Sequence, residues 1–307
     1  MFETLSGNAV SRFSFGTMQF GGKADEAASG AMYRACREAG INFFDTAYLY
    51  TYGASEEILG RLIATERDDI FLATKCGYHG ASPAEIDAQF SDSRRRLGCE
   101  TVDLLYIHRW DEETPLDATF GALASYVEAG AVRYIGVSNF AAWQVMKTEA
   151  VLRDMGQGIR FVQPMYNLVK RQVEVEILPM ALSEGFAVCP YSPLGGGLLT
   201  GKYAAGDSGR LSHDAHYASR YRQQWMHEAA AALVDLAAEV GVSPATLAVA
   251  WVARNPGIWG PIASARSAEQ LAPSLAAMSF EMDDDLYAQV SALSVAPPPA
   301  TDRDEQV

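Results

Sequence analysis

Positive charge is scarce in this sequence. Its 307 residues include 24 lysines and arginines against 38 aspartates and glutamates, which gives a formal net charge of −14. Surfaces that bind nucleic acid need clustered Lys and Arg to neutralise phosphates, so this balance argues against a nucleic-acid partner. Any phosphorylated ligand must find a local basic pocket within a field that repels it.

Cysteine motifs and long apolar runs are lacking as well. No CxxC pair and no metal-ligand spacing occurs, so we predict no metal site and expect reduced thiols at Cys36, Cys76, Cys99 and Cys189. No run approaches the roughly 20 apolar residues of a membrane span, and the first residues lack the basic and apolar stretches of a signal peptide. We therefore expect a cytoplasmic protein that does not contact a membrane.

What the sequence does contain is a regular alternation of short β-rich runs and longer amphipathic helices. Strands are predicted at 12–17, 41–45, 70–75, 102–108, 132–136, 160–164, 186–190 and 259–264. Helices are predicted at 25–39, 55–65, 116–129, 141–154, 173–183, 223–240, 243–254 and 283–293, and another begins at Ser82-Pro83. Eight β-then-α units favour a closed (β/α)8 barrel, the TIM barrel fold. The competing doubly wound sheet needs a GxGxxG turn, which residues 16–22 do not provide.

The composition shows no break that would divide the chain, so residues 1–296 are predicted to form a single barrel domain. Residues 1–11 would cover the amino-terminal end of the barrel. Residues 195–240, a glycine-rich loop with a helix, are inserted after the seventh strand, and we expect them to fold over a ligand. Residues 297–307 form a polar, proline-rich tail that we expect to be disordered or loosely docked.

Four polar residues lie at or just past the ends of predicted strands. Asp45, Lys75 and His108 each end such a run, and Tyr50 lies one tight turn beyond the first of them. In a barrel of parallel strands these positions converge on one mouth. A nearby ammonium lowers the pKa of a phenol, and a carboxylate keeps the ammonium charged and in place. The set therefore predicts proton transfer to or from a carbonyl or alcohol.

Short motifs that follow one another along nearly the whole chain resemble those of the aldo-keto reductases. They are Gly16-Thr17-Met18, Phe44-Asp45-Thr46-Ala47 with Tyr50 and Gly53, Thr74-Lys75, Ile107-His108-Arg109-Trp110-Asp111, Ile135-Gly136-Val137-Ser138-Asn139-Phe140, Gln163 to Asn167, Pro190-Tyr191-Ser192-Pro193-Leu194 and Ala265-Arg266. The resemblance implies an oxidoreductase that reduces an aldehyde or ketone, including sugar-derived ones, to the alcohol. Tyr50 would be the general acid, Lys75 its activator and Asp45 the partner of Lys75. His108 would orient the substrate carbonyl.

The resemblance also implies a nicotinamide cofactor, because no side chain can deliver a hydride. Tyr191 would stack on the nicotinamide, and Arg266 would bind the 2′-phosphate of NADPH. Ser138, Asn139 and Gln163 would hold the carboxamide. The remaining implied cofactor contacts are Thr17, Met18, Asp45, Ser192, Leu194, Gly196, Lys202, Arg210, Ser264, Gln270 and Ser274. Ser264 and Ser274 depart from the residues usual in the family, so use of NADH remains an alternative.

The substrate is expected to contact Phe20 and Trp110 besides Tyr50 and His108. Two other functions stay open. One is an NAD(P)+-dependent aldose dehydrogenase that works in the oxidative direction with Tyr50 as the base. The other is an NADPH-binding regulatory subunit, which resembles the β subunits of potassium channels. A monomer or a weak homo-oligomer is expected.

Overall fold

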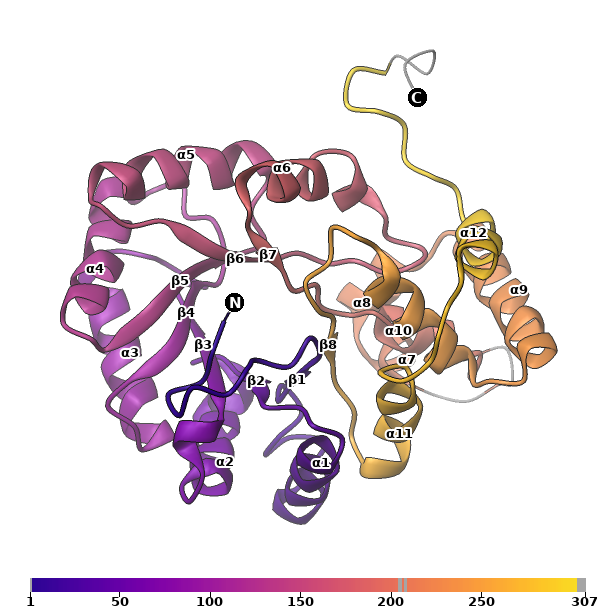
Figure 1. Ribbon diagram of the computed structural model, residues 1–307, viewed down its shortest axis with the longest axis horizontal. Helices are drawn as coiled ribbons and strands as arrows, with labels where there is room; N and C mark the ends of the chain where they lie inside the picture. The colour runs from indigo at the N-terminus through magenta and orange to yellow at the C-terminus, as the bar shows by residue number, and fades with distance from the viewer. Residues whose placement is uncertain (1, 204–205, 207–208, 303–307) are drawn as a thin grey trace.

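The computed structural model describes residues 2–203, 206 and 209–302. Eight parallel strands form one curled sheet, and the helices pack around its outside (Figure 1). The strands are β1 (Ser14–Gly16), β2 (Phe43–Asp45), β3 (Phe71–Cys76), β4 (Val102–Ile107), β5 (Val132–Ser138), β6 (Ile159–Gln163), β7 (Ala187–Val188) and β8 (Ile262–Ala263). Their order in the sheet is β7-β6-β5-β4-β3-β2-β1-β8. Each predicted strand overlaps one observed strand.

Helices alternate with the strands along the described chain. The α-helices are α1 (Glu26–Glu38), α2 (Ala54–Ile63), α3 (Pro83–Leu97), α4 (Leu116–Glu128), α5 (Ala142–Asp154), α6 (Ile177–Glu184), α7 (Arg210–His213), α8 (Ala215–Arg220), α9 (Gln224–Val240), α10 (Pro244–Arg254), α11 (Ala268–Ala276) and α12 (Asp284–Ala292). The 3-10 helices are η1 (Tyr50–Gly53), η2 (Arg67–Asp69), η3 (Gln172–Glu174) and η4 (Gly195–Thr200). The predicted helix starts at Ser82-Pro83 and Ser243-Pro244 are confirmed, since both serines cap their helices.

Proline explains two differences from the predicted elements. The helix predicted at 173–183 is divided into η3 and α6, because Pro179 has no N–H to donate and its ring clashes with the carbonyl four residues earlier. Strands β7 and β8 are two residues long, and Pro190 and Pro261 limit their ladders. Backbone bonds still join these two edges, from Trp259 N to Val188 O and from Ile262 N to Pro190 O, each 2.9 Å long.

Aromatic rings fill the amino-terminal end of the sheet. The ring centroid of Phe2 lies 4.4 Å from that of Phe161, 5.2 Å from Tyr134 and 5.9 Å from Trp259. Phe71, the first residue of β3, lies 6.4 Å from Phe2. The expectation that the first residues cover this end is confirmed for the described residues 2–11, which begin over the middle of the sheet in Figure 1. The polar residues at the carboxyl ends are therefore separated from the amino-terminal side by a packed core.

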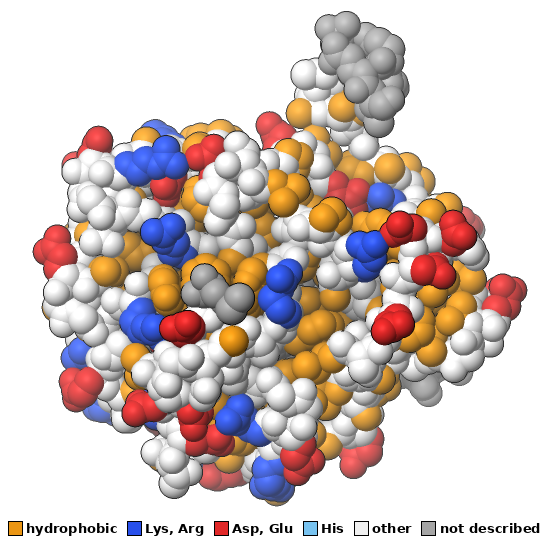
Figure 2. Space-filling model, viewed as in Figure 1, with side chains coloured by type: hydrophobic (Ala, Val, Ile, Leu, Met, Phe, Trp, Pro, Cys, Tyr) orange, Lys and Arg blue, Asp and Glu red, His pale blue; other side chains and the backbone are white. Residues whose placement is uncertain are grey.

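On the face shown in Figure 2, acidic, basic and apolar side chains are interspersed. After α12 the chain runs away from the helices (Figure 1), and Val295 is exposed. Among the described residues, no single helix is long and apolar enough to cross a membrane, and α9 with α10 passes that test only as a pair bent by 98°.

Candidate active site

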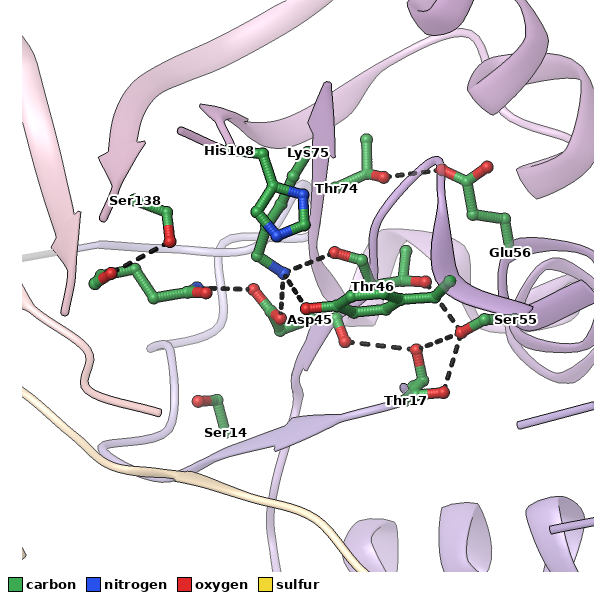
Figure 3. A network of polar contacts seen from close by, with 12 residues as sticks. Ser14, Thr17, Asp45, Thr46, Ser55, Glu56, Thr74, Lys75, His108 and Ser138 are labelled. Atoms are coloured by element: carbon green, nitrogen blue, oxygen red, sulfur yellow. Dashed lines mark hydrogen bonds and ion pairs between the residues drawn. The ribbon is translucent and has the colours of Figure 1, made fainter. Parts of the chain in front are cut away.

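Four polar side chains meet at the carboxyl end of the sheet (Figure 3). Asp45 ends β2, and Lys75 lies near the end of β3. His108 directly follows β4, and Tyr50 begins η1. The Lys75 ammonium forms an ion pair with Asp45 and donates hydrogen bonds to the Thr46 carbonyl at 2.6 Å and to the Tyr50 hydroxyl at 3.3 Å. Lys75 is fully buried, so its ammonium interacts with these groups and does not contact bulk water.

Burial and neighbouring charges oppose each other at this amine and phenol. Burial alone would lower the pKa of Lys75, but Asp45 and then Tyr50 outweigh it and raise that pKa above its ordinary value. For Tyr50, burial is the largest influence, and it raises the pKa of the phenol although Lys75 acts to lower it. The expectation of a lowered Tyr50 pKa is therefore wrong, because desolvation outweighs the attraction of the ammonium. At neutral pH the amine is charged and the phenol is protonated.

The imidazole of His108 is uncharged at neutral pH. Burial, followed by the charge of Lys75, lowers the pKa of His108 to about 3. Its ring lies edge-on to Tyr50 at 5.8 Å and to Tyr78 at 5.1 Å between centroids. Nδ1 is buried and has no hydrogen-bond partner within the described chain. A neutral imidazole beside a protonated phenol can donate a hydrogen bond to a carbonyl oxygen without competing for the proton.

A cluster of hydroxyl groups ties β1 and β2 to α2. Ser55 Oγ lies 2.8 Å from Thr17 Oγ1 and 3.0 Å from Thr46 Oγ1, and it donates a 2.8 Å bond to the Thr17 carbonyl (Figure 3). Both Ser55 and Thr17 are fully buried, whereas Met18 beside Thr17 is half-buried. Sequence reasoning missed Ser55. Its signal was a small hydroxyl residue two positions after Gly53, at the start of a helix.

The residues predicted to hold a carboxamide form one hydrogen-bonded chain at the ends of β5 and β6. Gln163 Nε2 donates to Asp45 Oδ2 at 2.9 Å, and Ser138 Oγ donates to the Gln163 carbonyl at 3.0 Å. Asn139 Nδ2 lies 3.1 Å from Ser138 Oγ, and Asn139 Oδ1 accepts from the Tyr191 hydroxyl at 2.7 Å. Asn139 adopts a left-handed φ of 59°. Such strain in a non-glycine residue is typical of functional sites.

The loop after β7 forms a second part of the mouth. The three glycines at 195–197 have positive φ values, and a Cβ at Gly196 would lie 2.8 Å from the Tyr217 ring. A Cβ at Gly197 would lie 2.8 Å from the Lys202 side chain. Glycine is therefore needed for this close backbone approach. Arg210 begins α7, but its side chain lies outside the described residues. The other predicted contacts on this loop, both half-buried, are Ser192 and Leu194.

Helix α11 starts shortly after β8, beside Arg266. Ser267 caps this helix, with its Oγ accepting from Gln270 N at 3.4 Å. Arg266 is half-buried, and its backbone N–H donates to Gln270 Oε1 at 3.3 Å. Ser264 is exposed, whereas Ser274 is buried. An arginine beside a helix start suits a phosphate group.

One opening is lined by His108, and a second one shares Tyr78 with it. A small cavity of about 40 Å³ has His108, Lys75 and Tyr78 in its lining. A wider cleft of about 700 Å³ extends outward over Trp110, whose ring contacts those of Phe140 and Trp143 at 5.3 and 5.4 Å. Trp110 thus lies at the wall of an open cleft, and its contact with the substrate stays a prediction.

Phe20 is not placed as predicted. Its side chain is fully buried in the core between the sheet and the helices, where its ring lies 5.7 Å from that of Phe15. It lines neither opening. The run after β1 turns Phe20 inward because its backbone N–H bonds back to the Thr17 carbonyl at 2.9 Å. Phe20 is therefore a core residue, and its prediction as a substrate contact is wrong.

Comparisons with known proteins agree with this geometry. A model of the "Aldo/keto reductase family" matches residues 12–295. The chain is 32% identical to the uncharacterized oxidoreductase YrpG of Bacillus subtilis (strain 168) over 95% of this chain and 94% of that protein. It is 34% identical to a probable voltage-gated potassium channel subunit beta of Oryza sativa subsp. japonica over 89% of each. It is also 34% identical to the aflatoxin B1 aldehyde reductase member 2 of Rattus norvegicus over 85% of this chain and 78% of the relative.

Proposed function

The chain belongs to the aldo/keto reductase family, and from that premise we propose that it reduces an aldehyde or ketone to the alcohol with Tyr50 as proton donor. The observation that carries this proposal is the buried Lys75 ammonium, which contacts Asp45 and the Tyr50 hydroxyl together. A bound nicotinamide supplies the hydride when the substrate is in place. The side chains at the mouth then have to provide one proton and one hydrogen bond.

Each of the four residues has a separate role in this proposal. Tyr50 gives its proton to the oxygen that was the carbonyl oxygen, and the adjacent Lys75 ammonium stabilises the phenolate that remains. Asp45 keeps Lys75 charged and in position. His108, neutral and directed into the mouth, donates a hydrogen bond that orients the carbonyl. In the oxidative direction the same phenolate would accept the proton from an alcohol.

The residues around the mouth fit a nicotinamide dinucleotide. Amide and hydroxyl groups of Ser138, Asn139 and Gln163 match the donors and acceptors of a carboxamide, and Tyr191 offers an aromatic face. The glycines at 195–197 adopt positive φ values that a residue with a Cβ would seldom take, and we propose that this loop backbone lies along the pyrophosphate. A nicotinamide cofactor is therefore assigned.

We propose that NADPH is preferred over NADH. The support is Arg266 at the capped start of α11, where a guanidinium and helix amides suit the 2′-phosphate. Ser264, Gln270 and Ser274 would line the rest of that adenosine site. The overall charge of −14 makes a local phosphate site of this kind necessary for tight binding.

We propose a neutral, hydroxylated aldehyde as the substrate, with sugar-derived aldehydes included. The cleft beyond His108 is mostly polar, and its charged lining comprises Arg109 and the carboxylates of Glu85, Asp111, Glu112 and Glu113. This surplus of carboxylates repels phosphorylated and carboxylated substrates. Trp110 offers a flat wall for the apolar face of a sugar.

The fold that carries this site is proposed to be a closed (β/α)8 barrel in a single domain over residues 1–296. The support is the pair of backbone bonds that join the edges at β7 and β8. All four cysteines are free, which suits a reducing compartment such as the cytoplasm.

A second function is suggested by the rice relative, whose name is that of a channel subunit. In that case the protein would bind NADPH and act through a partner. A stable tetramer in light scattering, combined with negligible carbonyl turnover, would favour that role. We propose instead a monomer or weak homo-oligomer with reductase activity.

A substrate screen tests the main proposal. Purified protein is mixed with NADPH or NADH and with aldehydes, ketones and aldoses, and absorbance of the reduced nicotinamide is followed. We expect turnover with hydroxylated aldehydes and weaker turnover with their phosphorylated forms. The reverse assay uses NADP+ and aldoses, and faster reduction of NADP+ would instead establish the dehydrogenase.

A further inference from the structure

A buried ion pair lies behind the loop that carries Tyr50. Arg96 in α3 and Glu56 in α2 approach to 3.3 Å between Nη1 and Oε2. The Glu56 side chain is fully buried and that of Arg96 is 14% exposed. Removing such a carboxylate from water is costly, and burial indeed raises the pKa of Glu56. Neither residue belongs to the four groups at the mouth.

Arg96 contacts the loop on both sides of Tyr50. Its Nη1 donates to the Tyr48 carbonyl at 3.0 Å, and its guanidinium lies 4.6 Å from the centre of the Tyr48 ring. On the other side it lies directly against Gly53, where a Cβ would come within 2.6 Å of Cζ. Arg96 therefore fixes the two ends of a short segment that contains the phenol.

The segment between those ends is strained. Thr51 and Tyr52 have φ values of 48° and 57°, a left-handed backbone conformation that residues other than glycine seldom adopt. Tyr52 is fully exposed, so its own side chain adds no packing that would hold the conformation. Such strain persists only where surrounding contacts enforce it. Arg96 supplies such contacts at both ends.

Glu56 extends the same contact to the strand that carries the amine. Its Oε1 accepts a 2.6 Å hydrogen bond from Thr74 Oγ1, and Thr74 directly precedes Lys75 in β3 (Figure 3). The pair thus connects the Tyr50 loop on one side with the Lys75 strand on the other. The hydrogen bond from the Lys75 ammonium to the Tyr50 hydroxyl is 3.3 Å long, which is longer than usual for a charge-assisted hydrogen bond. Its strength depends on how the loop is held.

We propose that Arg96 and Glu56 are positioning residues that set the Tyr50 phenol against the Lys75 ammonium. This inference rests on the proposed role of Tyr50 as proton donor. A displacement of the reacting group by about 1 Å can cost roughly 100-fold in rate, so loosening the loop should reduce turnover more than ligand binding. A merely structural pair would instead lower stability and leave the turnover of the folded enzyme unchanged.

The test compares Arg96→Met with Arg95→Met in the same helix. The Arg95 side chain is 67% exposed and pairs with Asp92 at 2.9 Å, so its removal is a matched control. We expect Arg96→Met to lower kcat by about 10- to 100-fold, with KM and the NADPH Kd within a few-fold of wild type. Arg95→Met should keep wild-type kcat. Wild-type kcat in folded Arg96→Met, confirmed by circular dichroism, would overturn the proposal.

Two further variants cover the case in which Arg96→Met does not fold. Arg96→Lys keeps the charge on a single donor nitrogen but loses the bidentate guanidinium geometry, so it should recover part of the lost kcat. Glu56→Gln keeps an acceptor for Thr74 while weakening the hold on Arg96, so it should lower kcat. In both variants, the basic limb of the plot of kcat against pH should move to higher pH. The reason is that a Tyr50 phenol farther from Lys75 is harder to ionise. An unchanged limb with unchanged kcat in both variants refutes positioning.

The same data separate this inference from the proposed function. If the wild-type protein reduces no carbonyl, the proposed function fails. If Tyr50→Phe abolishes turnover while Arg96→Lys and Glu56→Gln do not reduce it, only the positioning inference fails.

Discussion

Acid should destabilise this protein through His108 in a defined pH range. The structure lowers the pKa of this imidazole to about 3, whereas in the unfolded chain it returns to its ordinary value near 6.5. Between these values the unfolded chain binds a proton that the native protein does not. The free energy of unfolding therefore falls as pH falls from 6.5 toward 3, and below 3 both states are protonated.

The size of this effect follows from the two pKa values. Each pH unit in the range contributes about 1.4 kcal/mol, so between pH 6.5 and pH 4 His108 should remove about 3 kcal/mol of stability. His108→Gln cannot titrate and should lack this part of the slope. His216→Gln, which removes an exposed imidazole on α8, should keep it.

Urea denaturation at several pH values from 4 to 8 measures these slopes for the three proteins. Histidine NMR on the native protein supplies an independent check, because His108→Gln identifies the resonance to follow. A native midpoint near 6.5 for that resonance, or equal slopes in wild type and His108→Gln, would refute the reasoning. A neutral His108 also means that kcat/KM shows no acid limb near pH 6.5 from this residue.

Three further predictions concern the ion pair, the cofactor and the core. Lys75→Met leaves Asp45 buried without its cation, and we expect a loss of about 3–5 kcal/mol in urea denaturation together with loss of turnover; unchanged stability would contradict the pairing. Arg266→Ala should raise the KM for NADPH far more than the KM for NADH, and an equal rise for both would remove the 2′-phosphate assignment. Phe2→Ala should cost about 1–3 kcal/mol of stability, because Phe2 is only partly buried, while kcat at 25 °C stays normal. A cost below about 1 kcal/mol would show that Phe2 does not close the core.

The order and type of the elements could be predicted from the sequence because hydrophobic period and capping residues are local signals. Ser82-Pro83 and Ser243-Pro244 start helices as predicted. The convergence of Asp45, Lys75 and His108 followed from their places at strand ends, since parallel strands bring those ends together.

Other features depend on three-dimensional packing and could not be predicted. In the sequence, Phe20 is an aromatic residue that closely follows a predicted strand, which suggests a place near the mouth. Only the turn after β1 directs its side chain into the core. The net rise of the Tyr50 pKa depends on how much water the folded chain excludes, which spacing does not reveal. Arg96 lies 46 positions from Tyr50 and reaches its loop only through the packing of α2 on α3.

The most direct test of the account is the turnover of Tyr50→Phe beside its affinity for NADPH. This variant removes one hydroxyl and keeps the ring, so the cofactor site should remain intact. We expect NADPH Kd, measured by fluorescence titration, to stay within a few-fold of wild type while kcat falls by at least about 100-fold, the size of a general-acid contribution. Near-normal kcat in this variant would contradict the assignment of Tyr50 as the proton donor.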